Sequence, residues 1–332
     1  MKKILAIVCA LSMLFALCAC GESAAPASSA PAEEAAPAAA DKVYNVGVCQ
    51  LVQHPALDQA TQGFVDALNE KLGESVKVSV QNAAGDIPTC ATIVGTFVSD
   101  EVDLIMANAT PALQAAQAAT NAIPILGTSI TEYGVALGLD NFDGTTGINV
   151  SGTSDLAPLD GQAEVLHELF PDKASVGILY CSAEANSAYQ VETIKPMLEA
   201  YGYTVNTYKF SDSNDVAAVT AAACDENDVL YIPTDNTAAS CAEAIQNVAL
   251  PAGKPIICGE EGLCAGCGVA TLSISYYDIG YATGLMAVEI LSNGADVSTM
   301  PIQYAPQFTK KYNAANCDAL GIAIPEGYEV IG

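Results

Sequence analysis

The sequence predicts an α/β protein built from two lobes, each a doubly wound parallel sheet, which a hinge joins. Apolar runs of strand length alternate with segments of helical spacing over Val43–Cys258, which favours parallel sheets covered by helices on both faces. Gly, Asn, Asp and Thr interrupt this alternation over Gly138–Asp155, after which it resumes. The two halves also echo each other, because Val46–Leu51 and Val176–Cys181 are each followed by a polar break and a helical segment. Closure of the two lobes around a ligand is the motion expected of such a chain.

In the first half, hydrophobic periodicity predicts strands at 44–52, 76–80, 102–107 and 123–127 and helices at 57–72, 88–99 and 110–120. Thr110 occupies the predicted N-cap and Pro111 the first helical position. In the second half we expect strands at 147–150, 174–180, 203–208, 229–232, 255–258 and 269–275 and helices at 156–170, 187–201, 216–224, 237–248 and 276–291. Short strands are expected in 301–332, and the helix at 276–291 is expected to return to the first lobe. The predicted first lobe comprises 43–150 plus about 276–300, and the second 151–275 plus about 301–332.

The amino terminus predicts export and a lipid anchor. Residues 1–19 combine two lysines with an apolar run too short to span a bilayer, which is typical of a secretory signal peptide. The ending Leu17–Cys20 resembles a bacterial lipobox, which implies diacylglycerol on Cys20 and attachment to the outer face of the cell membrane. An ordinary cleaved signal peptide is the alternative. Residues 20–42 are almost all Ala, Pro, Ser and Glu and predict a flexible linker behind the anchor.

The net charge bears on possible partners, and the cysteines bear on the redox environment of the protein. A formal net charge of −27 repels phosphate backbones, so we expect no nucleic-acid partner. Beyond residue 20 the chain has nine cysteines, mostly in apolar strands and helices, where a free thiol acts as a small hydrophobic group. This pattern favours an organism living with little oxygen over a disulfide framework.

Cys264 and Cys267 form a C-x-x-C motif, which can be redox-active or form half of a zinc site. A second such pair is missing, and the two histidines are His54 and His167. We therefore expect a loop disulfide or free thiols, with a thiol-redox or metal-binding protein as an alternative function. The sequence also lacks a G-x-S-x-G elbow, a Walker-type phosphate loop and a G-x-G-x-x-G turn, so we expect neither catalysis nor a cofactor or metal.

Seven motifs follow one another along the chain: Gly47–Asp58, Gln81–Asp86, Ala107–Pro111, Ser154–Pro158, Glu184–Ser187, Tyr231–Asn236 and Tyr276–Gly280. In this order they resemble the motifs of the ABC-transporter substrate-binding proteins related to tryptophan and tyrosine binding. The resemblance covers about 43–310 and implies the type I periplasmic-binding fold. It departs at Glu132-Tyr133, where the family has Asp-Pro, and at Glu260-Glu261, where the family has one acid.

The resemblance implies an extracytoplasmic binding component of an ABC importer that delivers an amino acid, aromatic by preference, to permease subunits. We expect a monomer, with a ligand-sensing lipoprotein as the alternative. The candidate ligand-binding residues all follow apolar runs, where parallel sheets place ligands. Asp235 is expected to bind the ammonium group. The carboxylate is expected to bind to hydroxyls and backbone N–H groups of Thr110, Ser129, Asn186 and Ser187. Thr110 and Ser187 could also act only as helix caps. The further candidates are His54, Asn236 and Glu261.

Overall fold

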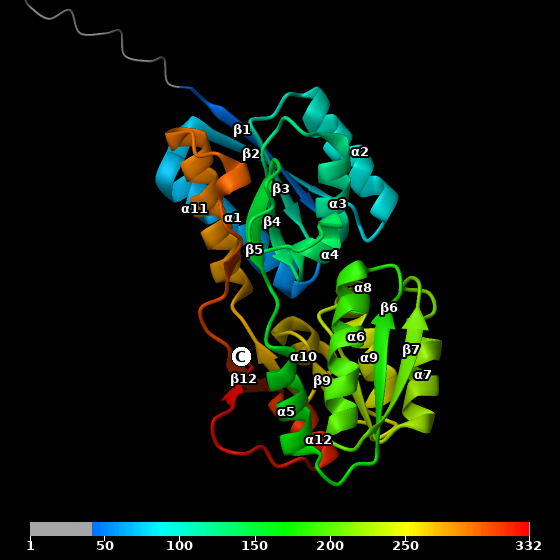
Figure 1. Ribbon diagram of the computed structural model, residues 1–332. Coiled ribbons are helices and arrows are strands. Elements are labelled where there is room, and N and C mark those ends of the chain that lie inside the picture. The colour runs from blue at the N-terminus through cyan, green and yellow to red at the C-terminus, as the bar shows by residue number, and fades with distance from the viewer. Residues whose placement is uncertain (1–41, 332) are drawn as a thin grey trace, which may run out of the picture. The chain divides into compact units, whose positions relative to one another are not determined.

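The computed structural model describes residues 42–331, which belong to one compact unit. The predicted signal peptide, the lipidation site Cys20 and all but the last residue of the predicted linker lie outside the described residues. Two sheets organise the unit, and helices cover both faces of each sheet (Figure 1). Within residues 42–331, every helix is too short or too polar to cross a bilayer.

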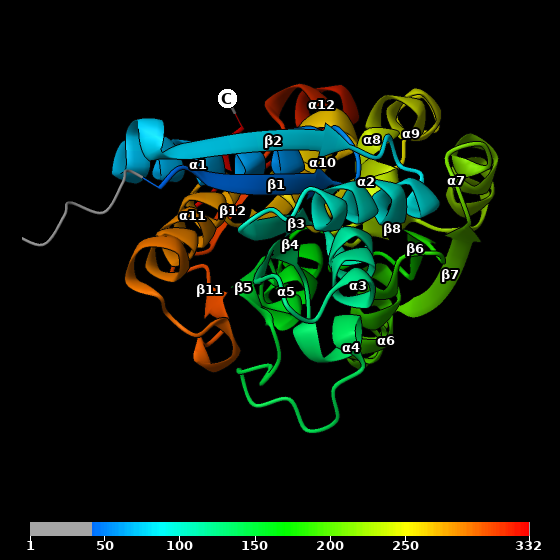
Figure 2. The same ribbon diagram turned by 90° about the horizontal axis from the view of Figure 1, so that it is seen from above.

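The first sheet has six strands in the order β11-β5-β4-β3-β1-β2, and all its pairs are parallel (Figure 2). Helices α1 and α11 cover one face, while α2, α3 and α4 cover the other (Figure 1). The strands are β1 (Tyr44–Gln50), β2 (Val76–Asn82), β3 (Leu104–Asn108), β4 (Ile125–Ile130), β5 (Val150–Ser154) and β11 (Gln303–Tyr304). The helices are α1 (Pro55–Leu72), α2 (Ile87–Ser99), α3 (Thr110–Ala119), α4 (Tyr133–Leu137), α11 (Tyr276–Asn293) and the short 3-10 turns Gly73–Ser75 and Val297–Thr299.

The second sheet has seven strands in the order β13-β12-β10-β9-β8-β6-β7, with only the β10–β12 pair antiparallel. Its strands are β6 (Ser175–Cys181), β7 (Thr204–Phe210), β8 (Val229–Ile232), β9 (Ile256–Cys258), β10 (Ala270–Ser273), β12 (Thr309–Tyr312) and β13 (Glu329–Val330). Its helices are α5 (Leu159–Leu169), α6 (Ala185–Ala200), α7 (Val216–Glu226), α8 (Asn236–Ser240), α9 (Ala242–Ala249), α10 (Glu261–Cys267) and α12 (Ala314–Leu320).

Alternation along the strands builds a separate core on each face of a sheet. On β8, Val229 and Tyr231 join the core beneath α5 and α6, whereas Leu230 and Ile232 join the core beneath α7 and α9. Successive side chains of a strand point to opposite faces, so a fully apolar strand needs helices on both sides. This confirms the predicted α/β class with two parallel sheets.

The chain passes between the sheets after β5, after β10 and after β11. Helix α11 follows β10 of the second sheet but packs on α1 of the first. Two glycines allow this approach, because a Cβ on Gly280 would lie 2.0 Å from the Ala60 carbonyl oxygen and one on Gly63 would lie 2.1 Å from that of Tyr277. The lobe boundaries stay a prediction; strands β5 and β11 both lie in the first sheet.

Four local predictions were wrong. Helix α3 begins at Thr110, so Ala109, with a φ of 91°, takes the N-cap position expected for Thr110. The strand expected at 147–150 runs instead over Val150–Ser154. A break at Cys241 divides the helix expected at 237–248 into α8 and α9. The C-x-x-C motif lies in helix α10 rather than in a loop.

Candidate ligand-binding site

The carboxyl ends of the two sheets meet where the lobes contact each other, as α3 and α4 lie against α6 (Figure 1). Loops after parallel strands gather at this edge of a sheet, and ligands of open α/β folds bind there. His54 follows β1, Thr110 follows β3 and Ser129 lies at the end of β4. From the second sheet, Asn186 follows β6 and Asp235 follows β8.

Four predicted site residues carry a buried polar atom without a hydrogen-bond partner. These atoms are His54 Nδ1, Thr110 Oγ1, Ser129 Oγ and Asn186 Oδ1. Buried polar groups in native proteins are nearly always hydrogen-bonded, and each exception calls for an explanation. Asn108 Oδ1 and Thr271 Oγ1 share this property. The four atoms of the predicted site residues come from both lobes, and each lies at the carboxyl end of a strand or at the start of the segment that follows it.

The backbone is strained at the same place. Ala109 has a φ of 91° and Ser129 a φ of 56°, both in the region that non-glycine residues rarely adopt. At Ser129 the pairing of β4 with β5 shifts register between Gly127 and Ile130. Residues held in such conformations cost of order 1–3 kcal/mol each and cluster at ligand sites. Two of the five non-glycine residues with positive φ in residues 42–331 are thus Ser129 itself and the neighbour of Thr110, and both Ser129 and Thr110 are expected to bind the carboxylate.

Hydrogen bonds fix the orientation of His54 and Asn236. The Asn236 side-chain amide donates from Nδ2 to Glu184 Oε2 at 2.6 Å, which turns its Oδ1 toward the other lobe. His54 Nε2 lies 3.2 Å from this Oδ1 and must carry the proton to donate to it. Burial lowers the pKa of His54, so the ring is neutral near pH 7 and Nδ1 keeps a free lone pair. His54 therefore offers the ligand an acceptor.

Asn186 is oriented in the same way. Its Nδ2 lies 3.2 Å from both Glu184 Oε2 and the Thr234 carbonyl oxygen, and it also approaches Ser187 Oγ at 3.3 Å. The unpartnered atom is therefore the amide oxygen, which accepts hydrogen bonds and cannot bind a carboxylate. The carboxylate role expected at Asn186 concerns its backbone N–H group and stays a prediction, whereas the side chain offers an acceptor. Asn186 suits the ammonium end of a ligand.

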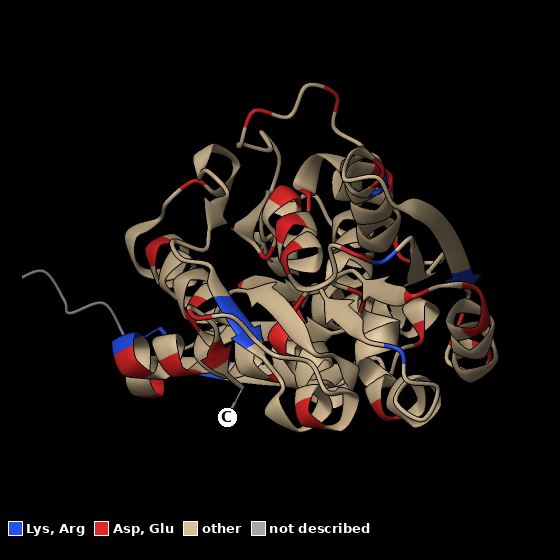
Figure 3. Ribbon diagram, turned by 90° about the horizontal axis from the view of Figure 1, so that it is seen from below, with Lys and Arg blue, Asp and Glu red and all other residues tan. Residues whose placement is uncertain are grey.

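Four carboxyl groups are buried near the meeting edges of the sheets: Asp155, Glu184, Asp235 and Glu260, each between 1% and 4% exposed. No lysine is buried among residues 42–331, and the chain contains no arginine. Figure 3 shows the same excess of acidic over basic residues on the helices of both lobes. A buried carboxylate needs a cation or several hydrogen bonds to remain ionised. The site is thus electrostatically suited to a cationic group.

The titration of these groups reflects their burial. Burial raises the pKa of Asp235 to about 7, and the charge of Glu184 adds to the rise. Its Oδ2 accepts from the Cys181 backbone N–H at 2.6 Å and its Oδ1 from that of Ala238 at 2.8 Å, so Asp235 also caps α8. Burial likewise raises the pKa of Glu260 to about 7 and that of Asp155 to about 6.

The remaining candidates lie in different surroundings. Ser187 is buried beside Asp235, and its hydroxyl opposes the rise of the Asp235 pKa that burial causes. Glu261 forms an ion pair with Lys311 at 2.6 Å, while the neighbouring Glu260 is the buried acid. Glu132 accepts from the Val135 N–H at 2.5 Å and caps α4. The Tyr133 hydroxyl donates to backbone carbonyls, 3.0 Å from that of Gly127.

Sequence reasoning missed Asp155, Glu184 and Glu260 as site residues. Each follows a strand closely, Asp155 after β5, Glu184 after β6 and Glu260 after β9, and this position is the signal that could have found them. Cys264 and Cys267 are buried in α10, and all nine cysteines in the described part of the chain are free thiols. Residues 42–331 contain no group of three or more side chains arranged to hold a metal ion.

Comparison with known proteins agrees with the geometry. Residues 45–330 match the family described as ABC transporter substrate binding protein. A tyrosine-binding protein of Clostridioides difficile (strain R20291) is 38% identical over 264 residues, which cover 79% of this chain and 76% of the relative.

Two solved structures are similar to this chain over most of its length. An ABC domain from Streptococcus pneumonia in complex with L-Trp superposes with a TM-score of 0.83 at 32% identity, covering 87% of this chain and 100% of that one. The ligand-free, open structure of a substrate-binding protein with adhesive properties from Clostridium difficile superposes with a TM-score of 0.66 at 38% identity, covering 87% of this chain and 99% of that one. This chain superposes better on the complex than on the ligand-free, open protein, although its sequence is more similar to the latter. The chain belongs to the ABC transporter substrate-binding protein family, whose members capture solutes outside the cytoplasm.

Proposed function

We propose that the captured solute is an L-α-amino acid with an aromatic side chain and that the two lobes close on its ammonium and carboxylate groups. The observation that carries this proposal is the separation of hydrogen-bonding types in the site. The unpartnered hydroxyls of Thr110 and Ser129 come from the first lobe, whereas the unpartnered acceptor of Asn186 lies beside the buried acids of the second. A zwitterion has the same two ends.

The carboxylate is assigned to Thr110 and Ser129. Hydroxyls can donate to a carboxylate, and Thr110 starts helix α3, whose first N–H groups and dipole favour an anion. The ammonium group is assigned to Asp235, with His54 Nδ1 and Asn186 Oδ1 as additional acceptors. Charge-assisted hydrogen bonds of this kind are roughly twice as strong as neutral ones. The binding of tyrosine by one relative and of L-Trp by another supports an aromatic side chain.

The amino terminus indicates where in the cell the protein acts. We propose that Cys20 carries a lipid, that residues 21–41 hold the lobes near the membrane, and that the closed monomer delivers its ligand to permease subunits without catalysing a reaction. The lipobox-like ending and the polar linker support the anchor. A Cys20→Ser variant tests it: the protein should leave the membrane fraction, and retention there would contradict lipidation.

A thermal-shift screen tests the ligand class. The purified protein is unfolded in denaturant, dialysed to remove any bound ligand, refolded, and melted with common amino acids, nucleosides and sugars. A ligand that binds only the folded state at about 100 times its Kd stabilises that state by about 2.7 kcal/mol, which for a protein of this size shifts the melting temperature by several degrees. L-tyrosine or L-tryptophan should give the largest shift. A shift with sugars or nucleosides alone would overturn the proposal.

A further inference from the structure

A cavity lies beside the candidate site, between loops of the two sheets. It lies between the loops after β1 and β2 of the first sheet and those after β6 and β7 of the second, and its volume is about 130 Å³. Glu184 and Thr237 line it and are hydrogen-bonded to each other, while Glu184 also binds Asn236, the partner of His54. Glu184 therefore links the wall of the cavity to the proposed ammonium site through hydrogen bonds.

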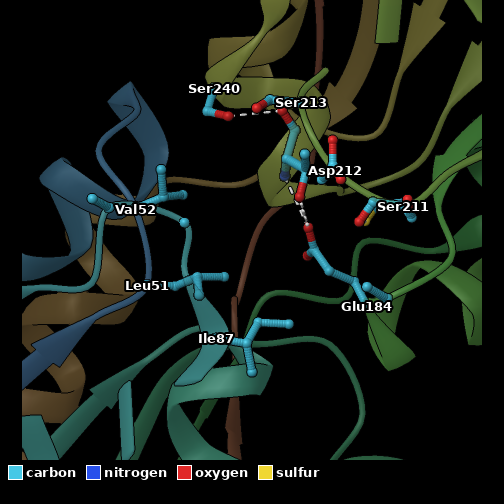
Figure 4. A pocket seen from close by; sticks show the side chains of 13 residues that line it. Leu51, Val52, Ile87, Glu184, Ser211, Asp212, Ser213 and Ser240 are labelled. Carbon is cyan, nitrogen blue, oxygen red and sulfur yellow. Dashed lines mark hydrogen bonds between the residues drawn. The ribbon is translucent and has the colours of Figure 1, made fainter. Parts of the chain in front are cut away.

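Its two walls differ in chemistry. Leu51, Val52 and Ile87 form an apolar wall from the first lobe, and Figure 4 shows Asp212 and Ser213 facing them from the second. An apolar wall opposite a hydrogen-bonding rim suits a flat side chain with a polar tip. Aliphatic side chains would leave the rim unused, and strongly charged ones would meet the apolar wall.

The strand order gives the direction in which a bound amino acid would extend. In the first sheet the order β4-β3-β1-β2 places Ser129 and Thr110 after β4 and β3, and the cavity after β1 and β2. Neighbouring strands lie about 4.8 Å apart, so the carboxylate site and the far end of the cavity are separated by roughly 10 Å. This separation matches an amino acid with a long aromatic side chain rather than a short one.

Asp212 lies on the rim of the cavity. Its Oδ1 accepts from the Asn214 backbone N–H at 2.8 Å, which holds the carboxylate on the loop after β7. A carboxylate accepts hydrogen bonds and donates none when ionised. It therefore favours a ring whose tip carries a donor, as the phenol O–H of tyrosine and the indole N–H of tryptophan do, over the ring of phenylalanine.

We propose that this cavity takes the aromatic ring of the bound amino acid and that Asp212 is a specificity-determining residue that accepts a hydrogen bond from the tip of the ring. This inference rests on the proposed function, because it assumes the ammonium and carboxylate assignments. It goes further in naming the part of the ligand, the subsite and the side chain that discriminates.

Isothermal titration calorimetry with L-tyrosine, L-tryptophan and L-phenylalanine tests the role of Asp212. The wild type should bind the first two more tightly than phenylalanine. Asp212→Asn keeps an oxygen for the Asn214 N–H and should weaken tyrosine and tryptophan binding by up to about tenfold, because a charge-assisted bond is lost at a side chain that is exposed in the unliganded protein. Phenylalanine binding should be unaffected. Asp215→Asn, an exposed acid on the same loop that does not line the cavity, is the matched control and should change nothing.

Fluorescence locates the ring independently. Because the chain contains no tryptophan, the indole emission of bound L-tryptophan arises from the ligand alone. It should be blue-shifted relative to free L-tryptophan, and Ile87→Ala, which removes an exposed part of the apolar wall, should move it back to the red and weaken binding of all three amino acids several-fold.

The role of Asp212 would be overturned, with the proposed function left intact, if the wild type bound tyrosine and phenylalanine with equal affinity. It would also be overturned if Asp212→Asn left the ratio of these affinities unchanged. An unchanged emission in Ile87→Ala would also overturn the placement of the ring. If the wild type binds no amino acid at all, the proposed function fails and this inference fails with it.

Discussion

His54 and Asn236 are hydrogen-bonded across the two lobes, with His54 Nε2 3.2 Å from Asn236 Oδ1 and 182 positions between them in the chain. The same histidine leaves Nδ1 without a partner. One side chain thus serves both closure and the recognition of a donor. A ligand that donates to Nδ1 would favour the tautomer that donates from Nε2, so ligand binding and closure would support each other.

His54→Ala should therefore weaken ligand binding by about tenfold or more, because a net hydrogen bond is worth about 1 kcal/mol and the variant loses one across the lobes and one to the ligand. The melting temperature of the unliganded protein should change little by comparison. Calorimetric titration with L-tyrosine measures the affinity, and thermal unfolding measures the melting temperature. An unchanged affinity would contradict the coupling of closure to recognition.

Thr110→Val should have opposite effects on stability and binding. The Thr110 hydroxyl is buried and unpartnered, and leaving such a group unsatisfied costs about 1–3 kcal/mol, so the isosteric valine should stabilise the unliganded protein or leave it unchanged. Ligand affinity should fall about tenfold. Thr220→Val is the control, since this buried hydroxyl donates to the Val216 carbonyl at 2.7 Å outside the site. A Thr110→Val protein with native affinity would refute carboxylate binding by Thr110.

Asp235→Asn should reduce the affinity for an amino acid at least tenfold, because it removes the negative charge facing the ammonium group while an amide oxygen can still cap α8. Asp296→Asn is a matched capping control on the 3-10 turn Val297–Thr299 and should bind normally. Binding to a ligand without its amino group should be insensitive to Asp235→Asn. If affinity for the amino acid is unchanged, Asp235 does not bind the ammonium.

The buried acids predict a pH dependence. Their folded-state pKa values, about 6 for Asp155 and about 7 for Asp235 and Glu260, lie above those of the unfolded chain. Their stabilising contribution is therefore complete at acidic pH, below the unfolded pKa values, and is lost as pH rises through the folded ones. These three acids should make the unliganded protein less stable from about pH 4 to about pH 7, while His54, whose pKa burial lowers, has the opposite effect below about pH 6.5.

A bound ammonium group stabilises the ionised carboxylate. The melting-temperature increase caused by ligand should thus grow over the same pH range, and binding near pH 7 should release protons. Titrations in two buffers with different ionisation enthalpies measure that release. A ligand-induced shift that is independent of pH, in wild type and in Asp235→Asn alike, would contradict pairing of the ammonium with these acids.

Hydrophobic pattern was enough to predict the α/β class and most elements. Fully apolar strands such as Val229–Ile232 require cover on both faces, and their spacing from helical segments is readable in a single chain. Errors fell where the outcome depends on a single backbone conformation. The positive φ of Ala109 moved the start of α3 by one residue, and the break at Cys241 divided one expected helix into two.

The site was predictable in position but only partly in chemistry. Residues after strands were found because topology brings them together, whereas burial separates Glu260 from Glu261 and depends on where α10 begins. Glu260 caps that helix and turns inward, while Glu261 pairs with Lys311. The acceptor role of Asn186 follows from a network with Glu184 and Thr234 that no local pattern shows.

Titration of the refolded, ligand-free protein with L-tyrosine and L-tryptophan, beside the same molecules lacking either the amino group or the carboxylate, tests the central claim most directly. Both amino acids should bind saturably, and removal of either charged group should lower the affinity at least tenfold. In Thr110→Val, removal of the carboxylate should lower the affinity less than it does in the wild type. Equal binding of the amino acids and their truncated forms, or no binding of either amino acid, would contradict the claim.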